Sequence, residues 1–164
     1  EEFESIRKTG KIAILLKEND ELISVKKTCG KNEIVIGASN GRMVRFLEDE
    51  VRVMGRNTSG VKGIDLDGSY VVGSESITSS DTILIVTDKN GMMVSLKSVV
   101  TGDYDMVIVT DSGIVIRMPL EQVPTLRRAT QGVKLINLKD SQKVASVTIV
   151  DKDSDEGNLE ENEA

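Results

Sequence analysis

Residues 33–77 read EIVIGASNGRMVRFLEDEVRVMGRNTSGVKGIDLDGSYVVGSESI, and this segment recurs later in the chain. Shifted by 72 residues, this stretch overlies residues 105–149 without a gap. Between residues 33–66 and 105–138, twelve of 34 positions are identical, whereas unrelated sequences of ordinary composition would share about two. The chain therefore contains an internal repeat, and its architecture can be predicted from one copy.

Each copy consists of short apolar runs separated by turn residues, a spacing typical of β-strands. Asn40-Gly41 separates two such runs and is a strong hairpin signal, because both residues tolerate positive φ. The hydrophobic content of 38% is mostly Ile, Val and Leu, with only 2% aromatic residues, which favours pleated, half-buried strands. The predicted strands are residues 11–16, 22–27, 34–38, 43–46, 61–66, 70–74, 82–87 and 92–97, and one helical turn is expected over residues 120–123.

These strands predict an all-β fold, a propeller-like ring of four-stranded repeats over residues 1–150. In the short third copy, residues 92–97 resemble residues 21–26, which form the last strand of a copy. The Arg-rich connection of the full copies is missing from this third copy. This copy is either a natural half-unit or one from which residues are absent. Because propellers normally have at least four blades, a fragment of a larger ring is one interpretation. The expected divisions are a partial copy (1–32), a full copy (33–80), the short copy (81–104) and a second full copy (105–150).

The net charge of −6 is carried by one end of the sequence. Residues 151–164, DKDSDEGNLEENEA, contain seven acids and one lysine, so that residues 1–150 are neutral overall. This last stretch has no apolar periodicity, and we expect it to be a disordered acidic tail. The body is therefore a neutral domain rather than an acidic one.

Composition argues against several functions. The sequence has no histidine, which removes the most common general base, the serine and cysteine triads and most zinc sites. No Walker A or dinucleotide fingerprint is present, so we predict no catalytic residue and no metal site, and we expect no cofactor in this chain. Cys29 is the single cysteine and is expected to be a buried or inert thiol rather than a reactive one. No apolar run approaches the roughly 20 residues of a membrane span and no secretory signal opens the sequence, so we expect a cytoplasmic protein without a membrane partner.

Basic residues recur at equivalent positions of the two full copies. Three basic positions coincide under the 72-residue shift, so a closed ring would carry them at equivalent places on its rim. Such a rim suits a duplex backbone contacted through its phosphates, whereas the low aromatic content counts against stacking on RNA or single strands. The neutral body also allows each of these residues to be an ordinary solvated side chain or to pair with a nearby acid. The coincident pairs are Arg45/Arg117, Arg56/Arg128 and Lys62/Lys134, and the candidate DNA-binding set further includes Lys11, Arg42, Arg52 and Arg127.

Residues 40–64, NGRMVRFLEDEVRVMGRNTSGVKGI, resemble a repeat of the C-terminal domain of the DNA gyrase A protein. Residues 127–136, RRATQGVKLI, resemble the last repeat of that family, where an acidic tail follows as it does here. The resemblance covers residues 1–150 and includes the connection, the spacing and the order of the motifs. The Gln-Arg-Arg-Gly-Gly-Lys-Gly box of the family has no intact match. The C-terminal tail of the corresponding topoisomerase IV protein is a close relative, and the runs GVKGI and TQGVKLI favour gyrase.

This resemblance implies a β-pinwheel, a propeller-like ring whose blades exchange strands. It also implies binding and wrapping of double-stranded DNA, largely independent of sequence, in support of ATP-dependent negative supercoiling by a whole topoisomerase. The implied partners are DNA, the N-terminal part of gyrase A, which holds the catalytic tyrosine, and gyrase B, with ATP and Mg acting elsewhere in that enzyme. This chain alone would be non-catalytic. The alternative class is a protein-interaction propeller without nucleic-acid binding, which would use a face or a central channel instead of a basic rim.

Overall fold

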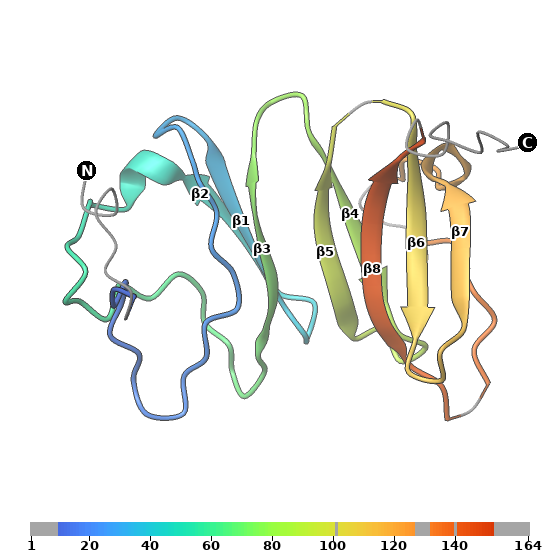
Figure 1. Cartoon of the computed structure of the whole chain (residues 1–164), viewed down its shortest axis with the longest axis horizontal. Coiled ribbons are helices and arrows are strands. Elements are labelled where there is room, and N and C mark those ends of the chain that lie inside the picture. The colour runs from blue at the N-terminus through green and yellow to red at the C-terminus, as the bar shows by residue number, and fades with distance from the viewer. Residues whose placement is uncertain (1–9, 101, 127–131, 140, 153–164) are drawn as a thin grey trace, which may run out of the picture.

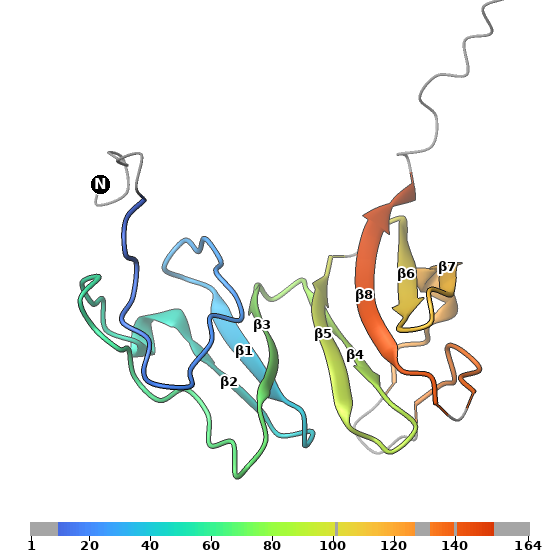
Figure 2. The same cartoon turned by 60° about the horizontal axis from the view of Figure 1, so that its bottom comes forward.

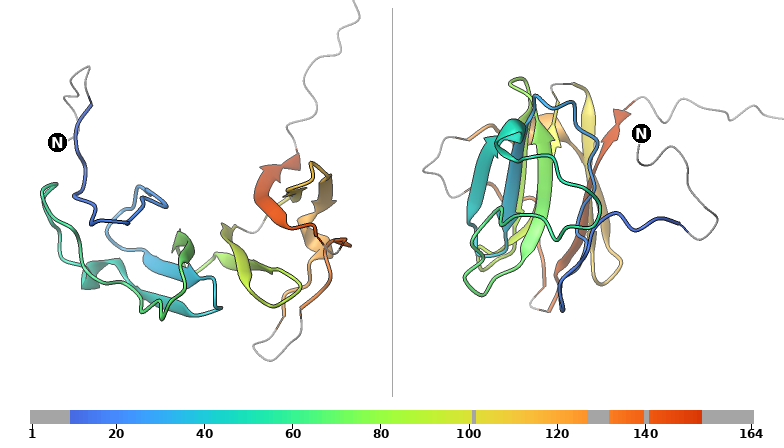
Figure 3. Two further views of the ribbon diagram at one scale, coloured as in Figure 1. Left: turned by 90° about the horizontal axis from the view of Figure 1, so that it is seen from below. Right: turned by 90° about the vertical axis from the view of Figure 1, so that its left-hand side faces the viewer.

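Antiparallel sheets make up almost all of the regular structure (Figure 1). The structure is a computed structural model, and it describes residues 10–100, 102–126, 132–139 and 141–152. Within these residues three sheets follow one another along a curve (Figure 3). The all-β class predicted from the sequence is confirmed. In spatial order, sheet A contains β2 (Met43–Leu47), β1 (Glu33–Ala38) and β3 (Val71–Ile77), sheet B contains β4 (Thr82–Thr87) and β5 (Met93–Val99), and sheet C contains β7 (Val115–Pro119), β6 (Tyr104–Thr110) and β8 (Val144–Asp151).

The same turn joins the first two strands of every sheet. In the β1–β2 hairpin, Gly41 N donates to Ala38 O and Ala38 N donates to Arg42 O, each over 2.9 Å. Equivalent bonds close the hairpins at residues 88–92 and 110–114. Within its turn Gly41 alone is left-handed, at φ 82°. The turn is therefore a four-residue turn closed by a left-handed glycine, rather than a two-residue turn in which both central residues have positive φ.

Each sheet has an inner strand that contacts the neighbouring sheet. These inner strands are β3, β5 and β8, because β5 packs against β3 on one side and β8 on the other. The central strands β1, β4 and β6 pair with them, and each of these pairings shifts its register by one residue near the end of the central strand. The outer strands β2 and β7 pair with β1 and β6 without such a shift. Sheet B has an inner and a central strand but no outer strand among the residues described.

Two apolar clusters hold the three sheets together. Side chains alternate between the two faces of a strand, so that sheet B presents one apolar set to sheet A and another to sheet C. Sheet B therefore lies between the other two sheets and contributes side chains to both clusters. The first cluster consists of Val35, Ile77, Met93 and Leu96, and the second consists of Val86, Met106, Ile108 and Val147.

A buried carboxylate also ties sheet A to sheet B. Glu75 on β3 is 7% exposed and accepts hydrogen bonds from Lys26 Nζ at 2.9 Å and from Ser98 Oγ at 3.0 Å. Its equivalent under the 72-residue shift is Val147, which lies in an apolar cluster. A buried carboxylate is costly unless it is both paired and hydrogen-bonded, and Glu75 meets both conditions. The hydrogen bond between Lys26 and Glu75 also attaches the segment before β1 to sheet A.

Three of the predicted strands do not form. Residues 11–16, 22–27 and 61–66 have no strand assignment, so these predictions are wrong. A strand needs a hydrogen-bonded neighbour along its length, whereas the first segment is held by an isolated backbone bond from Leu15 N to Thr58 O. Figure 2 shows this segment, in dark blue, as an irregular chain beside sheet A.

The remaining predicted strands are present with small differences in their bounds. β1, β2 and β4 match the predicted ranges within one residue, whereas β3 and β5 start one residue later than predicted and run further. The predicted helical turn is a single 3-10 turn, η2 (Leu120–Gln122). An equivalent 3-10 turn, η1 (Glu48–Glu50), follows β2 and was not predicted from the sequence.

The described body extends slightly into the acidic stretch. β8 ends at Asp151, and Lys152 Nζ lies 2.5 Å from Glu121 Oε1 and 3.8 Å from Asp103 Oδ1. The hydrogen bond to Glu121 raises the pKa of Lys152 above its usual value. The rest of the predicted tail, residues 153–164, lies outside the described residues.

The two hairpin glycines provide a test of this turn geometry. Gly41 and Gly113 have φ values of 82° and 80°, and no heavy atom lies within 4 Å of a Cβ built on either residue. We expect G41V and G113V each to lower the free energy of unfolding by about 1 kcal/mol or more, because a branched side chain is strained at positive φ. Urea denaturation measures this loss. Gly55, which is equally open but lacks a positive φ, is the control: if G55V is as damaging as the other two, backbone strain is not the cause.

Candidate nucleic-acid interface

The candidate basic residues gather on the outer strands and on the connections that follow them. We call this region the rim, defined as residues 42–66, 115–126 and 132–138. Lys11 lies in the irregular segment before sheet A, away from both outer strands in sequence. Arg127 and Arg128 lie outside the described residues. The candidates on the rim are Arg42, Arg45, Arg52, Arg56, Lys62, Arg117 and Lys134.

The arginines that recur on β2 and β7 are engaged within their own sheets. Arg45 contacts the carboxylate of Glu33 through Nε and Nη2, and Arg117 Nε donates to Asp105 Oδ2 over 2.6 Å. The two acids are equivalent under the 72-residue shift, as are the two arginines. Each pair is diagonal across neighbouring antiparallel strands, on one face of the sheet. The recurrence of these arginines thus has an explanation within the fold, independent of any ligand.

The pair in sheet C is the more buried of the two. The side chain of Asp105 is 12% exposed, compared with 30% for that of Glu33. Asp105 Oδ1 is buried and has no hydrogen-bond partner among the described residues. Arg117 therefore supplies the counter-charge for a carboxylate that is largely removed from water.

Arg42 and Lys62 form ion pairs that are open to water. Arg42 Nη2 lies 2.8 Å from Asp67 Oδ2, and Lys62 Nζ lies 3.0 Å from Asp65 Oδ1. The hydrogen bond and the charge of Lys62 hold the pKa of Asp65 below its usual value. Exposed ion pairs contribute little to stability, so both cations can exchange a carboxylate for a phosphate at small cost.

The other rim cations differ in how they are held. Arg56 is half-buried, and its Nη1 donates to the carbonyl of Ile12 over 3.1 Å, which links the rim to the segment before sheet A. Arg52 and Lys134 are exposed and make no hydrogen bond or ion pair with any residue that the structure describes. Their positive charges are thus the least compensated of the candidates on the rim.

Lys62 and Lys134 are placed by the same local backbone. Each follows a left-handed glycine by two residues, Gly60 at φ 77° and Gly132 at φ 74°. Both lysines are exposed. Lys62 and Lys134 are therefore equivalent in backbone conformation as well as in sequence position. Each of the two full copies has an ammonium group at this place.

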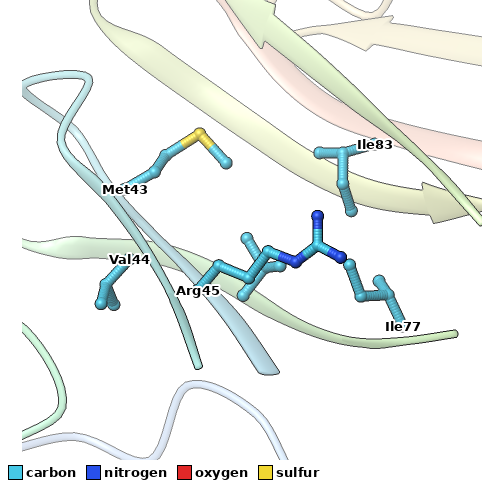
Figure 4. Close-up of a pocket in the computed structure, with 6 residues that line it drawn as sticks. Met43, Val44, Arg45, Ile77 and Ile83 are labelled. Atoms are coloured by element: carbon cyan, nitrogen blue, oxygen red, sulfur yellow. The ribbon is translucent and has the colours of Figure 1, made fainter. Parts of the chain in front are cut away.

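Arg45 also lines a pocket between sheets A and B (Figure 4). The pocket contains no nucleophile and no acid–base pair, so we assign no chemistry to it. Among the described residues, no group of His, Cys, Asp or Glu side chains is arranged to hold a metal ion. No helix in the described ranges is long and apolar enough to cross a membrane. The remaining lining residues are Val35, Met43, Val44, Ile77 and Ile83.

Sequence reasoning missed the acids that pair with the recurrent arginines. An acid stands twelve residues before the arginine in both copies, at Glu33 and Arg45 and again at Asp105 and Arg117. A hairpin with its turn midway between them brings such residues onto one face. Comparing the two copies for shared charge as well as for identity would have revealed this pairing.

A curved series of antiparallel sheets built from repeats, with basic outer strands and connections, defines a propeller-like all-β domain. The family model described as DNA gyrase C-terminal domain, beta-propeller, matches residues 1–29, 32–77 and 104–151. This chain belongs to that family.

Curated relatives extend over nearly the whole chain. The DNA gyrase A protein of Ureaplasma parvum serovar 3 (strain ATCC 700970) is 39% identical over 194 residues, which covers 99% of this chain and 23% of the relative. The DNA gyrase A protein of Staphylococcus aureus (strain MRSA252) is 37% identical over 191 residues, which covers 97% of this chain and 21% of the relative. The chain therefore spans less than a quarter of the length of these relatives.

Solved structures support the fold. A crystal structure of the C-terminal domain of DNA topoisomerase IV has a TM-score of 0.77 at 23% identity, covering 91% of this chain and 56% of that one. A structure of the DNA gyrase A C-terminal domain has a TM-score of 0.72 at 20% identity, covering 87% of this chain and 58% of that one. At these identities the likeness concerns the fold alone.

The short third copy stands out in these comparisons as well. The family match omits residues 78–103, which contain sheet B. The alignment with the Ureaplasma relative spans 194 positions, at least 30 more than the 164 residues of this chain. The relative therefore has residues with no counterpart here, in keeping with a sheet B that has no outer strand in the described part of the chain.

The buried ion pair yields a stability prediction. We expect R117M to lower the free energy of unfolding by about 1–3 kcal/mol, because the Asp105 carboxylate would be left buried without its counter-charge. At the more exposed pair, R45M should cost about 1 kcal/mol or less. Urea denaturation at neutral pH measures both losses. As a control, D105N added to R117M should recover part of the loss, and equal small losses in the two single variants would refute the burial argument.

Proposed function

We propose that this chain binds double-stranded DNA through its phosphates, largely independent of sequence, along the rim. The observation that carries this proposal is the equivalent placement of the exposed Lys62 and Lys134 in the two full copies. Cations repeated at equivalent points of a curved surface suit a polymer whose charges repeat regularly. Two arginines add positive charge to the same region. Arg52 is unpaired among the described residues, and Arg42 is in an exposed ion pair.

The recurrent arginines of the outer strands have a different role in this proposal. Arg45 and Arg117 are positioning residues, since their charges are compensated by Glu33 and Asp105 within the sheets. They hold β2 and β7 against the central strands, and thereby hold the connections that present the lysines. A phosphate contact from either arginine would have to compete with its own carboxylate.

We further propose that the chain acts as the C-terminal part of a gyrase A protein in the cytoplasm. The curated relatives are DNA gyrase A proteins, and this chain corresponds to less than a quarter of their length. In the whole enzyme its partners would be the N-terminal part of gyrase A and the gyrase B protein, and wrapping of the duplex would support ATP-dependent negative supercoiling. ATP and Mg would act elsewhere in that enzyme, and this chain would hold the duplex without a cofactor of its own.

Sheet B divides the proposed contact surface into two parts. The connection that carries basic residues in the full copies is missing between β5 and β6, where residues 100–103 join the strands. The duplex would therefore meet one basic segment after β2 and another after β7. Binding would depend on both segments, because the described residues of each segment include few unpaired cations.

The salt dependence of duplex binding tests the proposal. Fluorescence anisotropy with two duplexes of equal length and unrelated sequence should give similar affinities that fall linearly with the logarithm of salt concentration. R52A and K134A should each weaken binding to both duplexes and reduce the slope by about 1 or less, as one phosphate contact is lost. K97A, which removes a lysine from the inner strand β5, is the matched control. Affinity that is absent at low salt, or unaffected by both rim variants, would rule the proposal out.

A further inference from the structure

We propose that the outer edge of β4 is a docking edge at which a second copy of this chain pairs, β4 against β4, in antiparallel orientation. The position is defined by comparison within the molecule. The central strand β1 is flanked by β3 and β2, and β6 is flanked by β8 and β7, whereas β4 is flanked by β5 alone in the described residues. The backbone groups on the other side of β4 therefore lack the ladder partner that their equivalents have.

The residues of β4 leave this edge unprotected. β4 reads Thr82-Ile83-Leu84-Ile85-Val86-Thr87 and contains neither a charge nor a proline. Proteins usually protect free edges with charged residues, prolines or bulges, because an open edge pairs readily with another strand. The outer strands of the other sheets have such features, since β2 carries Arg45 and β7 carries Arg117 and ends at Pro119.

Side-chain exposure agrees with a missing neighbour. Ile85 is 43% exposed. The register shift follows Val86 in β4 and Val109 in β6, so the residue equivalent to Ile85 is Ile108. The side chain of Ile108 is completely buried. The central strand of sheet B thus exposes apolar surface at a position that is covered in sheet C.

A second copy suits this edge because the pairing is self-complementary. A two-fold axis perpendicular to the sheet and centred on Ile85 places Leu84 opposite Val86 of the partner, and Ile83 opposite Thr87. These central pairs are apolar or neutral, and at each end Thr82 lies opposite Asp88. Asp81, just before β4, and Lys89, in the turn after it, carry opposite charges, so each end of the pairing brings an acid of one copy near a base of the other. The interface would be isologous, and it requires no DNA and no contribution from the rim.

Sedimentation velocity over a range of concentrations tests the association, using the full 164-residue chain. The wild-type chain should form dimers at high concentration. I85K would place two ammonium groups opposite each other at the two-fold axis and should weaken dimerisation by about tenfold or more. L47K adds the same charge to an apolar residue of β2 that is 47% exposed, so it is the matched control and should dimerise as the wild type does.

Hydrogen exchange identifies the surface that is used. The β4 amides that point away from β5 should become protected as the wild-type chain dimerises, while those of β2 should not change. A wild-type chain that stays monomeric, or a dimer that I85K and L47K affect equally, would overturn the proposal. A chain that stays monomeric while a synthetic peptide of residues 42–47, RMVRFL, protects β4 would also overturn it, because the edge would then accept an outer strand from another source.

Discussion

The packing of sheet B between sheets A and C holds the three sheets in one domain. A two-stranded antiparallel sheet has little stability by itself, yet β4 and β5 supply side chains to both apolar clusters. Met93 and Leu96 close the contact with sheet A, and Val86 closes the contact with sheet C. Because both apolar clusters of the described residues involve this middle layer, the curve of the domain and the separation of its two basic segments are set there.

Repetition in the sequence reflects two different constraints on basic residues. Arg45 and Arg117 recur because a carboxylate recurs on the neighbouring strand, and the pair in sheet C is buried enough for its loss to be costly. Lys62 and Lys134 recur on exposed connections, after left-handed glycines. A position that is repeated for folding and one that is repeated for binding look the same in an alignment, and burial distinguishes them.

The repeat was sufficient to predict the all-β class, the hairpin at Asn40-Gly41 and the missing basic connection of the short copy. It could not predict which apolar segments become strands. Residues 11–16 and 61–66 have the same pattern as true strands but form no ladder of backbone hydrogen bonds with another strand among the described residues. Pairing depends on what lies alongside, which a local pattern does not contain. Likewise, the candidate cations could be named from the sequence, and a recurrent acid twelve residues earlier points to Glu33 and Asp105 as partners, whereas the Arg42–Asp67 pair depends on the fold.

In the proposed complex, exposed lysines on two separate connections contact one duplex. Lysine acetylation of the full chain, read by mass spectrometry with and without a duplex of arbitrary sequence, tests it most directly. We expect Lys62 and Lys134 to be protected together in the presence of DNA, and Lys97 on the inner strand β5 to react at an unchanged rate. Protection of Lys97 without Lys62 and Lys134, or a bound duplex that leaves both rim lysines fully reactive, would contradict the account.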